Sequence, residues 1–96
     1  MTKPGGLLLQ TIDALGRIVL RTFDLTGRVV ERTLDRVGGI VNERALGNLL
    51  EMTAIRETAG TAGGTMRTVT DNAGNVYDVS VDATGKILGA RLVQQH

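Results

Sequence analysis

The chain of 96 residues contains no cysteine and a single proline, Pro4. Without thiols it can form no disulfide bond, no thiol-based catalytic centre and no cysteine-ligated metal site. Phe23 and Tyr77 are the only aromatic residues, so a core has to be built from aliphatic side chains. The large aromatic anchors that dominate most binding hot spots are therefore scarce.

A strong charge of either sign is also missing, because 11 basic and 10 acidic residues give a net charge of +1. Proteins that bind nucleic acid usually carry a basic stripe, so we expect no nucleic-acid partner. The apolar run Leu7–Leu9 is too short for a signal peptide or a transmembrane segment, and neither is expected. The compartment stays open, with an extracellular or cell-surface location slightly favoured.

A repeat of 11 residues occupies most of the first half of the chain. Residues Thr11–Arg21, Thr22–Arg32 and Thr33–Glu43 align without gaps, and each carries an Asp-x-x-Gly motif. The motif returns twice downstream, and degenerate copies occur at residues 2–5 and 44–50. The repeated turn residues are Asp13, Gly16, Asp24, Gly27, Asp35, Gly38, Asp71, Gly74, Asp82 and Gly85.

Aspartate at the first position and glycine at the fourth are typical of a type I turn closed by a G1 bulge. The aspartate accepts hydrogen bonds from the turn backbone, and glycine supplies the left-handed conformation. The flanking residues are rich in β-branched types, which favour strands. We therefore predict an all-β fold, in which an antiparallel meander of tandem 11-residue hairpin units forms two packed sheets.

The period also allows a helical alternative, because 11-residue repeats occur in right-handed helical supercoils. Each unit would then place a glycine inside a helix, at about 1 kcal/mol relative to alanine. This cost favours strands for the repeat. A short helix stays possible at residues 43–58, where Leu46, Leu49, Leu50 and Thr53 fit one helical face.

The turn type also predicts the register, since the first turn residue lies opposite the residue after the glycine. The predicted cross-strand pairs are Gln10–Leu20, Thr11–Val19, Ile12–Ile18, Arg21–Glu31, Thr22–Val30, Phe23–Val29, Thr33–Val41 and Leu34–Ile40. One face then carries Ile12, Ile18, Leu34 and Ile40 in a row, together with Leu8, Leu20 and Val30. The other face carries Leu7, Val19, Phe23, Val29 and Val41. Because neither face is cleanly polar, we expect the second half of the chain to cover one face and a partner chain to cover the other. The alternative is that the mixed faces are simply wet at their rims, since most folded surfaces are more than half apolar.

The organisation we expect is one domain over residues 1–96. It comprises a repeat meander at residues 1–58, a Gly/Ala/Thr linker at 59–64 and a second, three-stranded meander at 65–96. The linker is the only low-complexity stretch.

No arrangement of residues indicates catalysis, and we expect neither an enzyme nor a cofactor. The single histidine is the terminal His96, and no Ser/His/Asp set can be built around it. The repeated aspartates lack the ligand spacing of known calcium loops, so no metal site is expected. Arg17 and Arg28 follow turn glycines that point to opposite edges of a meander and would not form one basic patch.

The segment Phe23–Val29, with its Asp-x-x-Gly-Arg turn, resembles the core of a YD (RHS) repeat, whose units are also β-hairpins. The resemblance covers roughly residues 11–42, with weaker echoes at 70–77 and 81–88. The family's tyrosine before the aspartate is absent, and the period is half the usual one. The resemblance implies hairpins and leaves the function open.

The expected function is that of a structural protein that self-assembles through β-strands into a filament, fibre or oligomer. Repetitive strands with unprotected edges and apolar rows on both faces favour it. The candidate self-association residues are Leu7, Leu8, Leu9, Ile18, Leu20, Phe23, Val29 and Val30. The alternative is a small non-catalytic β binding module for a protein or polysaccharide partner.

Overall fold

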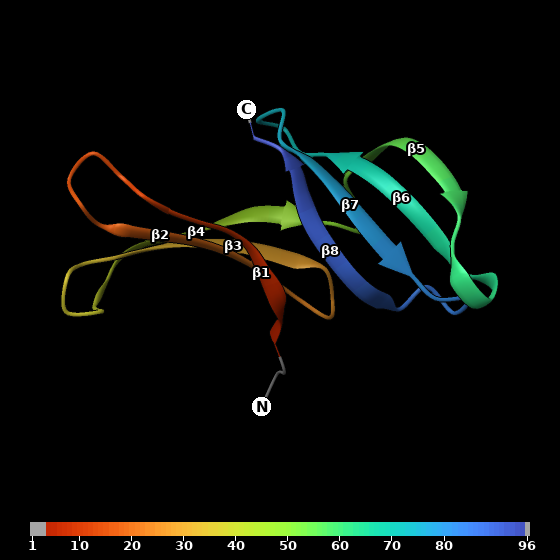
Figure 1. Cartoon of the computed structure of the whole chain (residues 1–96), viewed down its shortest axis with the longest axis horizontal. Coiled ribbons are helices and arrows are strands. Elements are labelled where there is room, and N and C mark those ends of the chain that lie inside the picture. Colours follow the sequence, from red (N-terminus) through yellow and green to blue (C-terminus); the bar gives the residue numbers. More distant parts are fainter. Residues whose placement is uncertain (1–3, 96) are drawn as a thin grey trace.

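Eight antiparallel strands make up the fold in the computed structural model, which describes residues 4–95. Sheet 1 contains, in order, β1 (Pro4–Ile12), β2 (Ile18–Asp24), β3 (Arg28–Leu34) and β4 (Ile40–Asn48). Sheet 2 contains β5 (Thr53–Ala59), β6 (Thr65–Thr70), β7 (Val76–Val81) and β8 (Ile87–Gln94). A 3-10 turn, η1, covers Thr61–Gly63. The prediction of an all-β meander folded as two sheets is confirmed (Figure 1).

The predicted register holds for all the cross-strand pairs but one. The first hairpin pairs Ile12 with Ile18, and the β2–β3 pair places Arg21 opposite Glu31. The pair Thr33–Val41 is wrong, because Thr33 lies opposite Asn42. Val41 is an extra residue in a β-bulge, which shifts the rest of β4 by one position.

A second bulge reverses the predicted facing of the leucines in β1. Leu9 pairs with Arg21 while Leu7 pairs with Thr22, so Leu8 is the extra residue between them. Leu8 packs into the core, whereas Leu7 is 53% exposed on the opposite face. We predicted the reverse facing for these two leucines. The bulge accounts for the difference, because a one-residue shift moves side chains to the other face of a sheet.

The helical alternative for residues 43–58 is wrong, since this segment forms parts of β4 and β5. Gly47 adopts a φ of 116°, which ends any helical run there. Leu49 then donates its backbone N–H to the Gly27 carbonyl at 2.7 Å, and its side chain is fully buried. The leucine pattern thus reflects an anchor in the turn between β4 and β5 and not a helical face.

The predicted division into residues 1–58 and 65–96 is wrong as well. The chain passes from sheet 1 to sheet 2 at the turn after Asn48, so sheet 2 has four strands and not three. The Gly/Ala/Thr stretch at 59–64 joins β5 to β6 within sheet 2. It forms a tight connection, in which the Gly60 N–H donates to the Gly64 carbonyl at 2.9 Å.

The core lies where one end of sheet 1 meets sheet 2. Its buried residues are Leu8, Phe23, Val29, Leu49, Val69, Tyr77, Val79, Val81 and Ile87. The other end of sheet 1, with the β1–β2 and β3–β4 turns, extends away from sheet 2 (left in Figure 1). The molecule is accordingly elongated, at 44 × 31 × 18 Å.

Candidate self-association surface

The five repeated aspartates direct their carboxylates into their own turns. In each case Oδ1 accepts backbone N–H groups two and four residues later, as Asp13 does from Leu15 and Arg17 at 2.9 Å each. The backbone N–H of Arg17 also holds the pKa of Asp13 below its usual value. All five turn glycines adopt positive φ, between 79° and 95°. The aspartates therefore act as turn formers in this structure.

No group of three or more His, Cys, Asp or Glu side chains within residues 4–95 is placed to hold a metal ion. A hollow of about 200 Å³ lies between the β4–β5 and β6–β7 turns. Its lining includes Asn48, Glu51, Met52 and Asp71, which present no recognisable catalytic arrangement. His96 lies outside the described residues. No helix in the described part of the chain is long and apolar enough to span a membrane.

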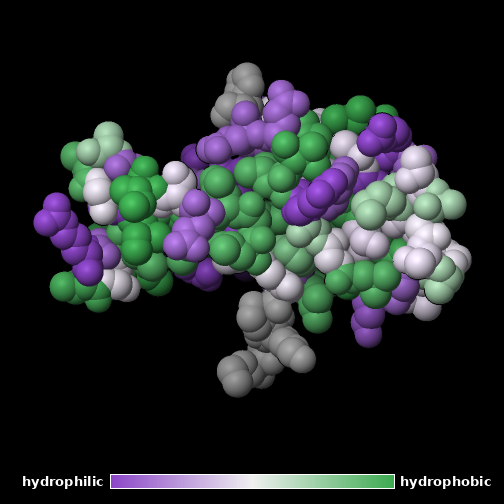
Figure 2. All heavy atoms as spheres, viewed as in Figure 1, coloured by the Kyte–Doolittle hydropathy of each residue, from purple (hydrophilic) through white to green (hydrophobic). Residues whose placement is uncertain are grey.

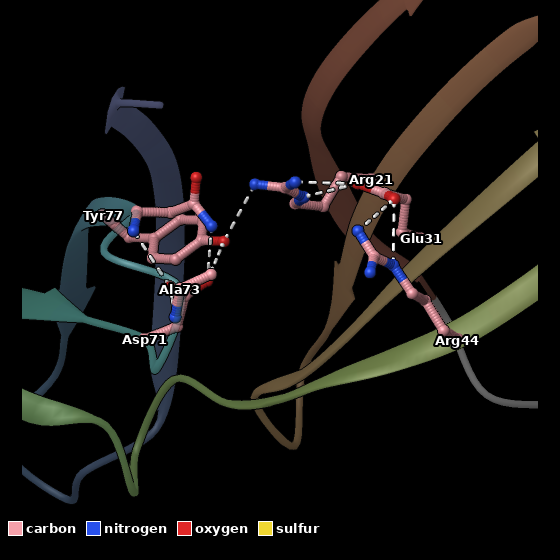
Figure 3. A network of polar contacts seen from close by, with 7 residues as sticks. Arg21, Glu31, Arg44, Asp71, Ala73 and Tyr77 are labelled. Atoms are coloured by element: carbon pink, nitrogen blue, oxygen red, sulfur yellow. Dashed lines mark hydrogen bonds and ion pairs between the residues drawn. The ribbon is translucent and has the colours of Figure 1, made fainter. Parts of the chain in front are cut away.

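A buried polar network connects the two sheets (Figure 3). Arg21 of β2 is 4% exposed and donates to Glu31 Oε2 at 2.7 Å and to the Tyr77 hydroxyl of sheet 2 at 3.1 Å. Tyr77 in turn donates to Asp71 Oδ2 at 3.0 Å, and Arg44 donates to Glu31 Oε1 at 2.9 Å. Every charge in the network thus has a partner, which is the condition under which buried charges are tolerated.

The network shifts the proton affinities of its members. Burial raises the pKa of Tyr77 from 10.0 to about 12, although the Arg21 cation acts in the opposite direction. Burial alone would raise the pKa of Glu31, but hydrogen bonds from Arg21 and Arg44 outweigh it and hold the pKa below its usual value. These shifts favour a neutral tyrosine and an ionised glutamate at neutral pH, the states in which Tyr77 donates to Asp71 and Glu31 accepts from both arginines.

The outer face of sheet 1, turned away from the core, is the most unusual surface of the molecule. It presents three cross-strand rows: Ile12–Ile18–Leu34–Ile40, Gln10–Leu20–Arg32–Glu43, and Leu7–Thr22–Val30–Ala45. Eight of these twelve residues are aliphatic. Ile12 and Ile40 at the rim are 68% and 59% exposed, so the described chain leaves this face uncovered.

The outer face of sheet 2 provides an internal comparison. Its rows are Thr53–Thr70–Val76–Gln94, Arg56–Thr68–Asp78–Arg91, and Thr58–Met66–Ser80–Gly89, of which only Val76 and Met66 are apolar side chains. Asp78 accepts from Thr68 at 2.8 Å and from Arg91 at 3.3 Å. The paired outer positions of sheet 2 are thus mostly polar, as expected of a soluble antiparallel sheet, and those of sheet 1 are not. The exposed apolar residues Ile55, Leu88 and Val93 of sheet 2 lie at strand bulges and form no continuous row.

The exposed apolar surface continues onto the hairpin turns at the free end of sheet 1. Leu15 and Val37 occupy the third turn position and are 71% and 92% exposed. The same position carries Thr26, Ala73 and Thr84 in the other repeated turns. Figure 2 shows apolar side chains gathered at this end of the molecule, next to charged ones.

The structure separates the eight candidate self-association residues into three groups. Four of them lie on the outer face of sheet 1, namely Leu7, Ile18, Leu20 and Val30. Leu9 lies beside Arg21 on the opposite face. The remaining three, Leu8, Phe23 and Val29, are buried in the core and are not accessible to a partner.

Three residues of this surface were missed as candidates, although the predicted row already contained them: Ile12, Leu34 and Ile40. The apolar residues of the turns, Leu15 and Val37, were missed as well. A comparison of equivalent positions between the repeats would have found them.

Comparisons of the chain with protein-family models, with curated proteins and with solved structures found no match. The resemblance of residues 11–42 to YD repeats therefore stays a prediction.

Proposed function

We propose that this protein is a structural β-module that self-associates through the outer face of sheet 1. The observation that carries the proposal is the contrast between the two outer faces, with eight aliphatic residues of twelve on sheet 1 and two of twelve on sheet 2. Covering apolar surface gains roughly 25 cal/mol for each Å² removed from water. A contiguous exposed apolar patch is typical of an interaction site.

The charges on this face support a close contact. Arg32 and Glu43 are the only charged residues among the twelve, and they form an ion pair of 2.6 Å with each other. The face is therefore neutral as a whole, and a covering surface meets no unbalanced charge. Both side chains lie in the middle row of the face, so association covers the two partners together and leaves neither charge unpaired.

The strand edges are less suited to association than the face. The edge strands are β1 and β4 in sheet 1 and β5 and β8 in sheet 2. Because β1 and β8 lie against each other where the sheets meet, β4 and β5 are left as the free edges. Each of these two carries a charged pair near its middle, Glu43–Arg44 and Arg56–Glu57. Charges on an edge strand discourage the addition of further strands. We therefore propose a face, and not an edge, as the site of the self-association predicted from the sequence.

The decisive measurement is the mass of the purified protein by sedimentation velocity at increasing concentration. We expect the mass to rise above that of the monomer, whereas the double variant Ile18→Thr/Leu34→Thr should associate at least about tenfold more weakly. Val76→Thr/Met66→Thr on the outer face of sheet 2 is the matched control and should associate like the unchanged protein. A protein that stays monomeric at high micromolar concentration contradicts the proposal.

A further inference from the structure

We infer that the partner is a second copy of this chain, docked face to face about a two-fold axis that runs parallel to the strands between β2 and β3. The inference rests on the proposed function and specifies its geometry. Most closed homo-oligomers use two-fold interfaces, in which one patch has to be complementary to itself. The three rows of the outer face of sheet 1 meet this condition for one direction of the axis.

Rotation about this axis reverses the order of the strands across the sheet. Each row keeps its position along the strands, so it faces the same row of the partner. Strand β1 then lies over the partner's β4, and β2 lies over the partner's β3. The facing pairs are Ile12 with the partner's Ile40, Ile18 with the partner's Leu34, Gln10 with the partner's Glu43, Leu20 with the partner's Arg32, Leu7 with the partner's Ala45, and Thr22 with the partner's Val30. Two sheets stacked in this way correspond to the aligned packing of a β-sandwich.

The chemistry of these pairs is complementary in every row. In the first row each aliphatic side chain meets an aliphatic side chain. In the middle row the amide of Gln10 can hydrogen-bond the partner's Glu43, while Leu20 packs on the aliphatic stem of the partner's Arg32. No like charges face each other, so the interface avoids the repulsion that opposes wrong partners.

The other axis direction within the face is unfavourable. A two-fold axis along the rows would place Arg32 over the partner's Arg32 and Glu43 over the partner's Glu43. It would also stack the isoleucine row on the row that contains Thr22 and Ala45, where less apolar surface is available. The avoidance of like-charge contacts and the larger apolar contact therefore both favour the axis parallel to the strands.

The size of the face sets the expected strength of the dimer. Twelve residues on each copy form the rows, against roughly 20–30 on each side of a standard specific interface. Leu15 and Val37 at the free end extend the contact. We therefore expect a reversible dimer with a dissociation constant in the micromolar range, whose subunits exchange when two variants are mixed.

Cysteine crosslinking tests the geometry, because the chain has no cysteine of its own. The variants Ile12→Cys and Ile40→Cys each change one exposed position at the rim of the face. The crosslinking reagent is a bifunctional maleimide long enough to span the roughly 10 Å between face-packed sheets. A mixture of Ile12→Cys and Ile40→Cys copies should give crosslinked dimers. Ile12→Cys alone should not, because its two thiols lie three strand spacings apart sideways, about 14 Å, in addition to the sheet separation.

The alternative axis predicts a different product. It would place Ile12 over the partner's Leu7, so a mixture of Ile12→Cys and Leu7→Cys copies would crosslink best. That result, or crosslinking of Ile12→Cys with itself, overturns the arrangement while leaving self-association intact. A monomeric protein that gives no product in any mixture overturns both the arrangement and the proposed function.

Discussion

Gly27 is the turn glycine with the most demanding surroundings. Its φ of 95° lies in the left-handed region, as in the other repeated turns. In addition, a Cβ at this position would collide with Asn48 Oδ1, because the β4–β5 turn packs directly on it. Asn48 is held there by its own bond, in which Nδ2 donates to the Thr26 carbonyl at 3.0 Å. One small residue therefore serves both the hairpin and the crossing between the sheets.

Three valine substitutions separate these two roles. Gly27→Val should lower the free energy of unfolding by roughly 3 kcal/mol, since it combines backbone strain with overpacking. Gly38 has a φ of 87°, but a Cβ added there would have no neighbour within 4 Å. Gly38→Val should therefore lower the free energy of unfolding by about 1–2 kcal/mol, from backbone strain alone. Gly89→Val lies in open space on β8 and should change stability by about 0.5 kcal/mol or less.

Urea unfolding followed by circular dichroism measures all three variants. Equal losses of stability for Gly27→Val and Gly89→Val would show that position 27 needs neither the left-handed conformation nor the absence of a side chain beside Asn48. Equal losses for Gly27→Val and Gly38→Val would remove the role of the contact with Asn48.

At the residue scale the turns were predictable from the sequence and the bulges were not. The aspartates and glycines form hydrogen bonds within a few residues of each other, so their spacing carries the information. The bulges at Leu8 and Val41 have no comparable local signal. The bulge at Leu8 places this side chain in the core, among residues far away in the chain. The bulge at Val41 leaves its side chain 49% exposed and so has a different origin.

At the scale of the elements, the contact between the sheets was the least predictable feature. The pair Arg21–Glu31 follows from the hairpin register, but the bond from Arg21 to Tyr77 joins residues 56 positions apart. Nothing in a local pattern indicates which part of sheet 2 lies over Arg21. The same holds for Leu49, whose place in a helical-looking run concealed its role as the anchor between sheets.

Tyr77 reports directly on this contact, because it is the only tyrosine and the chain has no tryptophan. A tyrosine with a raised pKa in the folded state adds stability that is full below its unfolded value of 10.0 and is lost as the pH rises towards about 12. We therefore expect the tyrosinate absorbance of the folded protein to titrate near pH 12. The stability should fall over the same interval.

The control is the same titration in concentrated denaturant, where the midpoint should return to about 10. A folded protein, verified by circular dichroism, that already titrates near its ordinary value would show that Tyr77 is in water. In that case the two sheets do not pack through the network of Arg21 and Asp71.

At the scale of the whole molecule, the uneven packing of the two sheets is the feature with functional content. Sheet 2 has one covered face and an outer face whose paired positions are mostly polar. Sheet 1 is covered only at the end that carries Leu8, Phe23 and Val29. The sequence predicted that sheet 1 would need a second cover, because its strands are apolar on both sides. It could not show which residues the core already uses, and three of the eight candidates are among them.

Hydrogen exchange distinguishes the face from the edges as the site of association. If copies stack through the outer face of sheet 1, the outward N–H groups of the free edges β4 and β5 stay in water in both monomer and dimer. Their exchange should be fast and independent of protein concentration. The amides of β2 and β3, which lie under the interface, should exchange more slowly as the dimer forms, because dimerisation stabilises the folded state by mass action.

The informative strand is β5, since all seven of its residues are exposed. Addition of a strand from another copy would hydrogen-bond every second amide of an edge strand and slow its exchange strongly. Protection of β5 or β4 that rises with concentration would therefore assign association to the edges and contradict the face-to-face arrangement. Concentration-dependent protection confined to β2 and β3 would instead show that the repeat builds a flat apolar surface for stacking, with the charged pairs of β4 and β5 keeping the edges free.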